Sequence, residues 1–144
     1  MVNNKYLSMK NIFLYLWQLP QNLLGLLLIA IYKPEEVLTQ YNGNKVYFAS
    51  KFPGGISLGK YSIVSKLYYR KNKDYSLNTY TVLHESVGHA KQSRILGPLY
   101  LIIIGLPSII WAGLYGPVIK PTKNGYYKFY TEKWADKLAD IKRK

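Results

Sequence analysis

The run HESVGH, which extends from His84 to His89, contains both histidines of this chain of 144 residues. Glu85 directly follows the first of them. Imidazole nitrogens are good zinc ligands, and a glutamate beside such a ligand can act as the general base for a metal-activated water. Residues 79–94 around the run have helical character, and Gly97 with Pro98 is expected to end or kink that helix. The run therefore predicts two metal ligands and a base on one helix.

The spacing of the two histidines constrains the shape of this helix. In the common zinc-peptidase signature the histidines are four residues apart, which leaves their directions about 40° from each other. His84 and His89 are five residues apart, and on a regular helix that spacing separates side chains by about 140°. A one-residue π-bulge would return both to one face, and Gly88 is the residue whose backbone yields most readily. We therefore expect a distorted helix at Gly88.

A second polar run supplies a candidate third ligand. Two histidines need a third protein ligand and an open position to make a catalytic zinc site. Downstream lies EKWAD, in which Glu132 and Asp136 are four residues apart and can share one helix face. Residues 126–144 around it predict an amphipathic helix with a lysine-rich opposite side. Its expected apolar face consists of Phe129, Trp134, Leu138 and Ile141.

Together the two runs resemble known zinc peptidases. HESVGH is similar to the His-Glu-x-x-Gly-His motif of dipeptidyl peptidase III, and EKWAD resembles the Glu-x-x-Ala-Asp element of the gluzincins. The resemblance implies Zn²⁺ held by His84, His89 and Glu132, with Asp136 behind His84 and Glu85 as the catalytic base. The longer stretch of residues 84–101 also looks like a widespread group of small bacterial proteins that generally lack an assigned activity.

Simpler interpretations stay open for the same residues. The histidines can be a solvated or core pair on a helix, and the two acids of EKWAD can be partners of nearby lysines on a solvated surface. A gluzincin site often has a tyrosine that stabilises the oxyanion, and the sequence does not choose between Tyr126, Tyr127 and Tyr130. Gln92 and Ser93 continue the helix predicted over residues 79–94, called the metal helix below, and are assigned no role.

The composition limits both the kind of site and the kind of partner. The chain has no cysteine, which excludes disulfide scaffolds, thiolate zinc clusters and cysteine nucleophiles. Its formal net charge of +13 suggests a polyanionic neighbour. No recognisable nucleic-acid-binding module is present, so nucleic acid is not expected. Anionic membrane lipid is the expected partner.

Two apolar stretches support a membrane location. Residues 11–32 and 95–119 are each long enough to cross a hydrocarbon core of about 30 Å. If residues 95–119 crossed the bilayer, the two histidines and Glu132 would lie on opposite sides and could share no metal. The zinc hypothesis therefore predicts a re-entrant hairpin that turns near Pro107, where Gly105 and Ser108 also interrupt the apolar run. Pro20 similarly divides the first stretch.

These observations predict an α+β fold of one domain that covers residues 1–144. Residues 44–94 are expected to hold two or three short antiparallel strands between 44 and 69, a loop over 70–78 and the metal helix, as in a minimal zincin-like fold. Apolar helical segments at 11–32 and 95–119 are membrane-embedded or buried, and residues 126–144 carry EKWAD.

The predicted function is a membrane-associated zinc-dependent hydrolase that cleaves a peptide or protein substrate. The excess of lysine places the site on the cytoplasmic side of a bacterial inner membrane. The alternative is a non-catalytic membrane protein with a structural or absent metal site, which acts through lipid or protein binding.

Overall fold

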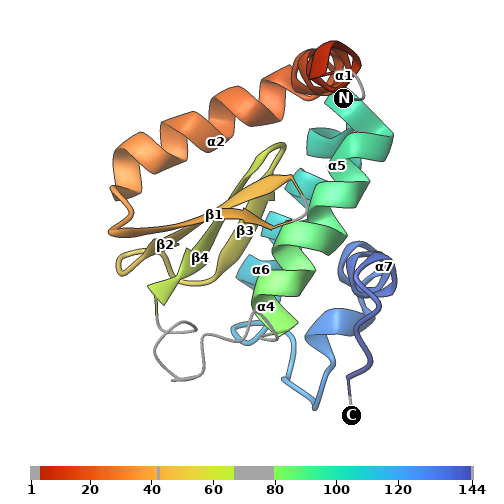
Figure 1. The fold of residues 1–144 in the computed structure, drawn as a ribbon. Coiled ribbons are helices and arrows are strands. Elements are labelled where there is room, and N and C mark those ends of the chain that lie inside the picture. Colours follow the sequence, from red (N-terminus) through yellow and green to blue (C-terminus); the bar gives the residue numbers. More distant parts are fainter. Residues whose placement is uncertain (1–3, 42, 67–79, 144) are drawn as a thin grey trace.

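The computed structural model describes residues 4–41, 43–66 and 80–143, and in them the fold is mixed α+β, as predicted (Figure 1). In chain order the elements before the metal helix are α1 (Asn4–Trp17), α2 (Leu19–Tyr32), β1 (Glu36–Tyr41), β2 (Asn44–Ala49), β3 (Gly55–Leu58) and β4 (Tyr61–Ser65). The metal helix is formed by α4 (Tyr80–Leu83), the π-helical turn η1 (His84–His89) and α5 (Ala90–Leu96). It is followed by η2 (Gly97–Leu99), η3 (Leu101–Gly105), α6 (Leu106–Leu114), η4 (Tyr126–Lys128) and α7 (Tyr130–Leu138).

The four strands form one mixed sheet in the order β1-β2-β4-β3. The three strands predicted between residues 44 and 69 are present as β2, β3 and β4, whereas β1 was not predicted. The expectation of antiparallel strands is correct for β1–β2 and β3–β4 and wrong for β2–β4, which pair in parallel. The reason is that β3 turns back at Gly59, with φ +64°, and β4 inserts between β2 and β3. The loop predicted over residues 70–78 lies outside the described residues.

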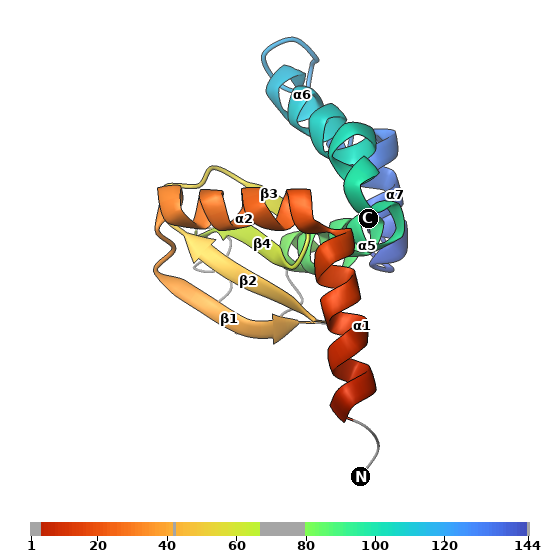
Figure 2. The same cartoon turned by 90° about the horizontal axis from the view of Figure 1, so that it is seen from above.

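The sheet lies between α2 and the metal helix. On one face, Val46, Phe48 and Val64 form a buried cluster with Val82 of α4. On the opposite face α2 crosses the sheet (Figure 2), and at Gly25 an added Cβ would lie 3.0 Å from the ring of Tyr61. The sheet therefore holds the start of the metal helix in place through apolar packing.

Buried amides fix the corner between α1 and α2. The two helices meet at 81°, with Pro20 in the first turn of α2, where its missing N–H is tolerated. Gln21 Nε2 donates to Ser93 Oγ at 3.0 Å and to Gly97 O at 2.7 Å, and Ser93 Oγ donates to Gln18 Oε1 at 2.8 Å. These bonds join the corner to the end of the metal helix.

The second apolar segment turns near its start and not at its centre. The prediction that Gly97 with Pro98 ends or kinks the metal helix is confirmed: α5 ends at Leu96, and the chain bends by 119° between Leu99 and Leu101. The predicted turn near Pro107 is wrong, because the chain runs as helix from Leu101 to Leu114 and continues through this proline. The carbonyl of Ile103, four residues before it, accepts a hydrogen bond from Tyr130 Oη at 2.6 Å.

Much apolar side-chain surface is exposed on these helices. No residue of α6 is buried. Ile102 is 68 % exposed, and on α1 and α2 Phe13 and Ile31 are 64 % and 60 % exposed. Among the described residues no single helix is long and apolar enough to cross a membrane. Two bent helix pairs, α1 with α2 and residues 80–99 with 101–114, have that length and apolarity only when the two helices of each pair are taken together.

We predict that Gln21→Ala lowers the free energy of unfolding by about 1–3 kcal/mol, because Ser93 and the Gly97 carbonyl lose a buried donor. Leu27→Ala, at a 54 % exposed position of the same helix, should change it by less than about 0.5 kcal/mol. Chemical denaturation of both variants measures the difference. Equal stability of the two would contradict a role for the amide network.

Candidate metal centre

The helical distortion predicted for the metal helix is present. The turn from His84 to His89 is π-helical, between regular α-helical turns on both sides. In a π-turn the hydrogen bonds span five residues, so side chains five apart lie nearly above one another. The imidazole rings of His84 and His89 accordingly lie 4.7 Å apart between centroids.

Gly88 has a different role from the one that the sequence suggested. It lies against the backbone of α7, where an added Cβ would come within 2.4 Å of Ala135 O. Only a glycine permits this contact, which brings α7 onto η1 and places Glu132 beside the two histidines. The close approach of two helices, rather than backbone flexibility, is thus the evident reason for a glycine here.

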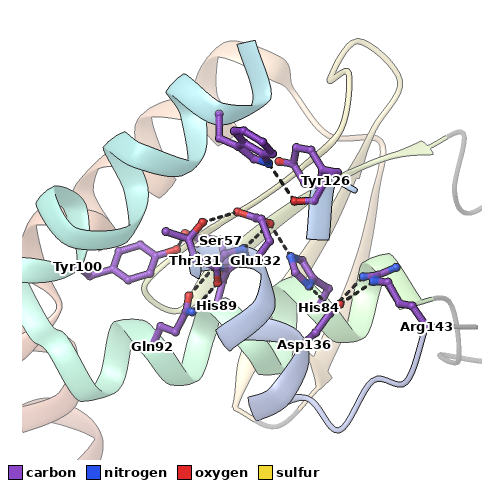
Figure 3. Close-up of polar contacts among 11 residues, drawn as sticks. Ser57, His84, His89, Gln92, Tyr100, Tyr126, Thr131, Glu132, Asp136 and Arg143 are labelled. Atoms are coloured by element: carbon purple, nitrogen blue, oxygen red, sulfur yellow. Dashed lines mark hydrogen bonds and ion pairs between the residues drawn. The ribbon is translucent and has the colours of Figure 1, made fainter. Parts of the chain in front are cut away.

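Three atoms of the kind that bind metal ions lie close together between η1 and α7 (Figure 3). Glu132 Oε2 lies 2.9 Å from His84 Nε2 and 3.3 Å from His89 Nε2, and one donor atom from each residue falls within 4.8 Å of the others. Zinc bonds of about 2.0–2.2 Å in a tetrahedral arrangement place neighbouring ligand atoms roughly 3.3 Å apart. The buried group of His84, His89 and Glu132 could therefore hold a metal ion.

Each histidine is oriented through its other ring nitrogen. His84 Nδ1 donates to Asp136 Oδ1 at 2.7 Å, which matches the position that the resemblance assigned to this aspartate. His89 Nδ1 donates to Gln92 Oε1 at 2.6 Å, and Gln92 Nε2 donates to Thr131 O of α7 at 2.8 Å. Such bonds fix the ring and leave Nε2 as the ligand atom. The sequence analysis gave Gln92 no role, although its position three residues after His89 on one helix was a usable signal.

Ion pairing sets the charges of the cluster. Burial alone lowers the pKa of His84, but its hydrogen bonds to Asp136 and Glu132 outweigh burial and raise that pKa to about 9. Burial raises the pKa of Glu132, but the bonds from His84 and His89 hold it well below its ordinary value. In the metal-free protein His84 is therefore a cation at neutral pH, and a metal ion must displace its proton.

Glu85 is buried beside this group without a fixed partner. Its Oε2 has no hydrogen-bond partner among the described residues, and burial raises the pKa of its carboxyl group. The charges of His84 and His89 act in the opposite direction. Gly55 of β3 leaves the space for Glu85, because a Cβ there would lie 2.7 Å from Glu85 Oε1. A buried carboxylate with a raised pKa holds a proton more readily than one in water, as a general base must.

Tyrosines surround the site, but most have structural contacts. Tyr127 packs its ring edge-on against His84 at 5.3 Å, and the hydroxyl of Tyr130 donates to Ile103 O. Tyr100, which the sequence analysis did not consider, is 3 % exposed and donates from its hydroxyl to Ser57 O of β3 at 2.8 Å. Burial and the charges of Glu85 and Glu132 raise the pKa of Tyr100, so it stays a neutral hydroxyl beside the site.

Of the simpler interpretations, the solvated ones do not describe the structure. His84 and His89 are 3 % and 5 % exposed and are paired with Glu132, an arrangement that a core pair of histidines shares with a metal site. Glu132 and Asp136 are buried and paired with histidine and Arg143 rather than with lysines.

The apolar face expected over residues 126–144 is not the most buried side of α7. Phe129, Trp134, Leu138 and Ile141 are half-buried, whereas Thr131, Glu132, Ala135 and Asp136 are buried. Pairing of the polar groups, and not apolar periodicity, decides which side of α7 faces the protein.

The chain matches no family model, no curated protein and no solved structure.

We predict that Gly88→Ala separates α7 from η1, because its methyl group would collide with the Ala135 carbonyl. The free energy of unfolding should fall by about 1–3 kcal/mol and zinc affinity should fall with it. Gly113→Ala in α6 is the matched control, since nothing lies within 4 Å of the added methyl group. That variant should be as stable as the parent or slightly more stable. Isothermal titration with zinc and thermal unfolding measure both effects, and unchanged zinc binding by Gly88→Ala would refute this role for the glycine.

Proposed function

We propose that this chain is a membrane-associated zinc-dependent hydrolase that cleaves a peptide or protein substrate. The observation that carries the proposal is the meeting of His84 Nε2, His89 Nε2 and Glu132 Oε2 beside the buried carboxylate of Glu85, one oxygen of which finds no partner in the part of the chain that the structure describes. Two imidazoles and one carboxylate form the ligand set of several catalytic zinc sites, which leave a fourth position open. A structural site of that composition would have no need of Glu85.

Each residue of the site would have a separate role in hydrolysis. A zinc ion bound there would supply Lewis acidity towards a carbonyl group and towards water. Glu85 would take the proton of the attacking water and pass it to the leaving amine, since its raised pKa lets it hold that proton transiently. Asp136 and Gln92 would keep the two imidazoles aligned throughout.

The sheet offers a place for an extended substrate. β3 is an edge strand, and its residue Gly55 lies directly against Glu85. The Ser57 carbonyl of this strand already accepts a hydrogen bond from Tyr100 Oη. A peptide could therefore pair with the edge only beside Gly55, where it would pass in front of the general base. Main-chain pairing of this kind recognises any extended peptide and leaves the choice of sequence to side-chain pockets.

The proposal predicts about one zinc ion per purified chain. His84→Ala should lose the zinc, whereas Glu85→Gln should keep it and lose hydrolysis by about 10²- to 10⁴-fold, because only the proton transfer is removed. Elemental analysis gives the metal content, and mass spectrometry of a mixed peptide library incubated with each variant gives the cleavage. Equal zinc content in the parent and in His84→Ala would exclude the metal site. Equal cleavage by the parent and by Glu85→Gln would exclude the mechanism.

A second candidate function is favoured by the exposed apolar helices. In it the chain is a non-catalytic membrane protein, with a structural or absent metal site, that acts through lipid or protein binding. α1 and α6 extend from the body in opposite directions (Figure 2) and expose apolar side chains along their length. Helices of this kind can lie in the plane of one leaflet, where their apolar sides are covered by acyl chains. A cellular effect that survives Glu85→Gln would favour this function over hydrolysis.

Both candidates place the chain at an anionic membrane, and its three tryptophans allow a direct test. Trp17 is the last residue of α1 and is 40 % exposed. Trp111 lies on α6, and Trp134 lies on α7, directly after Lys133. Variants that keep one tryptophan each, with the other two changed to phenylalanine, should bind anionic vesicles with brominated acyl chains. We expect quenching of Trp17 and Trp111 and little quenching of Trp134. No quenching at any position, or equal quenching at all three, would exclude this orientation.

A further inference from the structure

One basic side chain outside the two motifs contacts both supports of His84. Arg143 Nε donates to Asp136 Oδ2 at 2.6 Å, and its Nη2 donates to Asp136 Oδ1 at 2.9 Å. The same guanidinium lies 3.1 Å above the ring of Tyr127, and Tyr127 in turn packs edge-on against His84. Arg143 therefore fixes the aspartate that holds the His84 ring (Figure 3) and also the aromatic ring of Tyr127 that packs against that histidine.

The chain turns after α7, and this turn places Arg143 beside Asp136. Asp140 adopts a left-handed backbone conformation with φ 54°, and Ile141 N donates to Asp136 O at 2.9 Å. This turn reverses the chain at the end of the helix and returns Arg143 to a residue seven positions earlier. Lys142, the neighbouring cation, is exposed and forms no ion pair with any residue that the structure describes. Only a planar guanidinium can bind both carboxylate oxygens and stack on a ring at once.

The two histidines differ in how they are held. His89 is oriented by Gln92 of its own helix, three residues away, so the metal helix itself provides that support. His84 is oriented by Asp136 of α7, and Asp136 is in turn fixed by Arg143. The His84 half of the site thus depends on the segment after α7, whereas the His89 half depends on Gln92 of the same helix and on the Thr131 carbonyl that Gln92 binds.

We propose that Arg143 is a positioning residue of the metal centre: by clamping Asp136 and Tyr127 it holds the His84 ring in the orientation that presents Nε2 to the metal. This inference rests on the proposed zinc site and adds a residue that neither motif contains. Without the guanidinium, the carboxylate of Asp136 is free to rotate and to face water, so the His84 ring is less well ordered before metal binds. The binding free energy must then include the cost of ordering it.

The test compares Arg143→Gln and Arg143→Lys with Lys142→Gln, which removes one adjacent exposed charge. Zinc affinity of the full chain is measured by competition with a chromophoric chelator, and Co²⁺ absorption in the visible range reports the ligand geometry. We expect Arg143→Gln to weaken zinc binding by about tenfold, at the lower end of the range for groups behind a metal ligand. Arg143→Lys should recover part of that loss and Lys142→Gln should bind as the parent does. The Co²⁺ spectrum should change in Arg143→Gln alone.

A double-mutant cycle separates positioning from general stability. In an Asp136→Asn background, Arg143→Gln should weaken zinc binding by clearly less than tenfold, because the route through Asp136 is already broken and only the contact through Tyr127 remains. Parental zinc affinity in Arg143→Gln, or an equal tenfold loss in the Asp136→Asn background, would overturn the inference. Failure of the parent chain to bind zinc would instead overturn the proposed site itself, and the inference with it. If Arg143→Gln does not fold, Arg143→Lys decides, since an unchanged zinc affinity in that folded variant also overturns the inference.

Discussion

The pairing of buried charges between η1 and α7 is the constraint on which the arrangement of this chain depends. His84, His89, Glu132 and Asp136 are all removed from water, and an ionised group buried without a partner costs several kcal/mol. Each of them finds its partner on the other helix. The helices must therefore approach closely, and Gly88 against the Ala135 carbonyl is what makes that distance possible. Removal of either helix would leave buried charges unpaired on the other.

The rest of the fold supports this crossing from two sides. The sheet packs Val46, Phe48 and Val64 against the start of the metal helix, and its edge strand leaves space for Glu85 at Gly55. At the other end of that helix, the amides of Gln18 and Gln21 bind Ser93 and Gly97. The helix that carries the histidines is thus fixed at its beginning by apolar packing and at its end by hydrogen bonds. α6 lies outside this framework, because it buries none of its own residues and contacts the body through Trp111, which stacks on Phe129 at 4.7 Å.

The two apolar segments illustrate how local rules can identify a break and misplace it. Pro20 was expected to divide the first segment, and it does lie at the start of α2, just after the corner. Pro107 carries the same signal, yet the helix that begins at Leu101 continues through it, although the proline cannot donate a main-chain hydrogen bond to the Ile103 carbonyl. The actual bend falls between Leu99 and Leu101, after the glycine and proline that were expected to end the metal helix. A tertiary contact, the hydroxyl of Tyr130 on the Ile103 carbonyl, compensates for the proline.

The sequence by itself determined the donor chemistry, because a chain without cysteine and with two histidines five residues apart limits both the ligand types and the shape of the helix. The π-turn follows from that spacing once both rings must face the same partner, since only a longer turn returns them to one side. The meeting of His84 with Glu132, 48 residues later, was expected only from the resemblance of EKWAD, and no local pattern predicted that of Tyr100 with Ser57, 43 residues apart. Only the tertiary structure decided the parallel pairing of β2 with β4, the buried side of α7 and the roles of Gln92 and Arg143. Local periodicity governs which segments become helices and strands, but their contacts depend on which packing leaves the fewest buried polar groups unpaired, and no single segment carries that information.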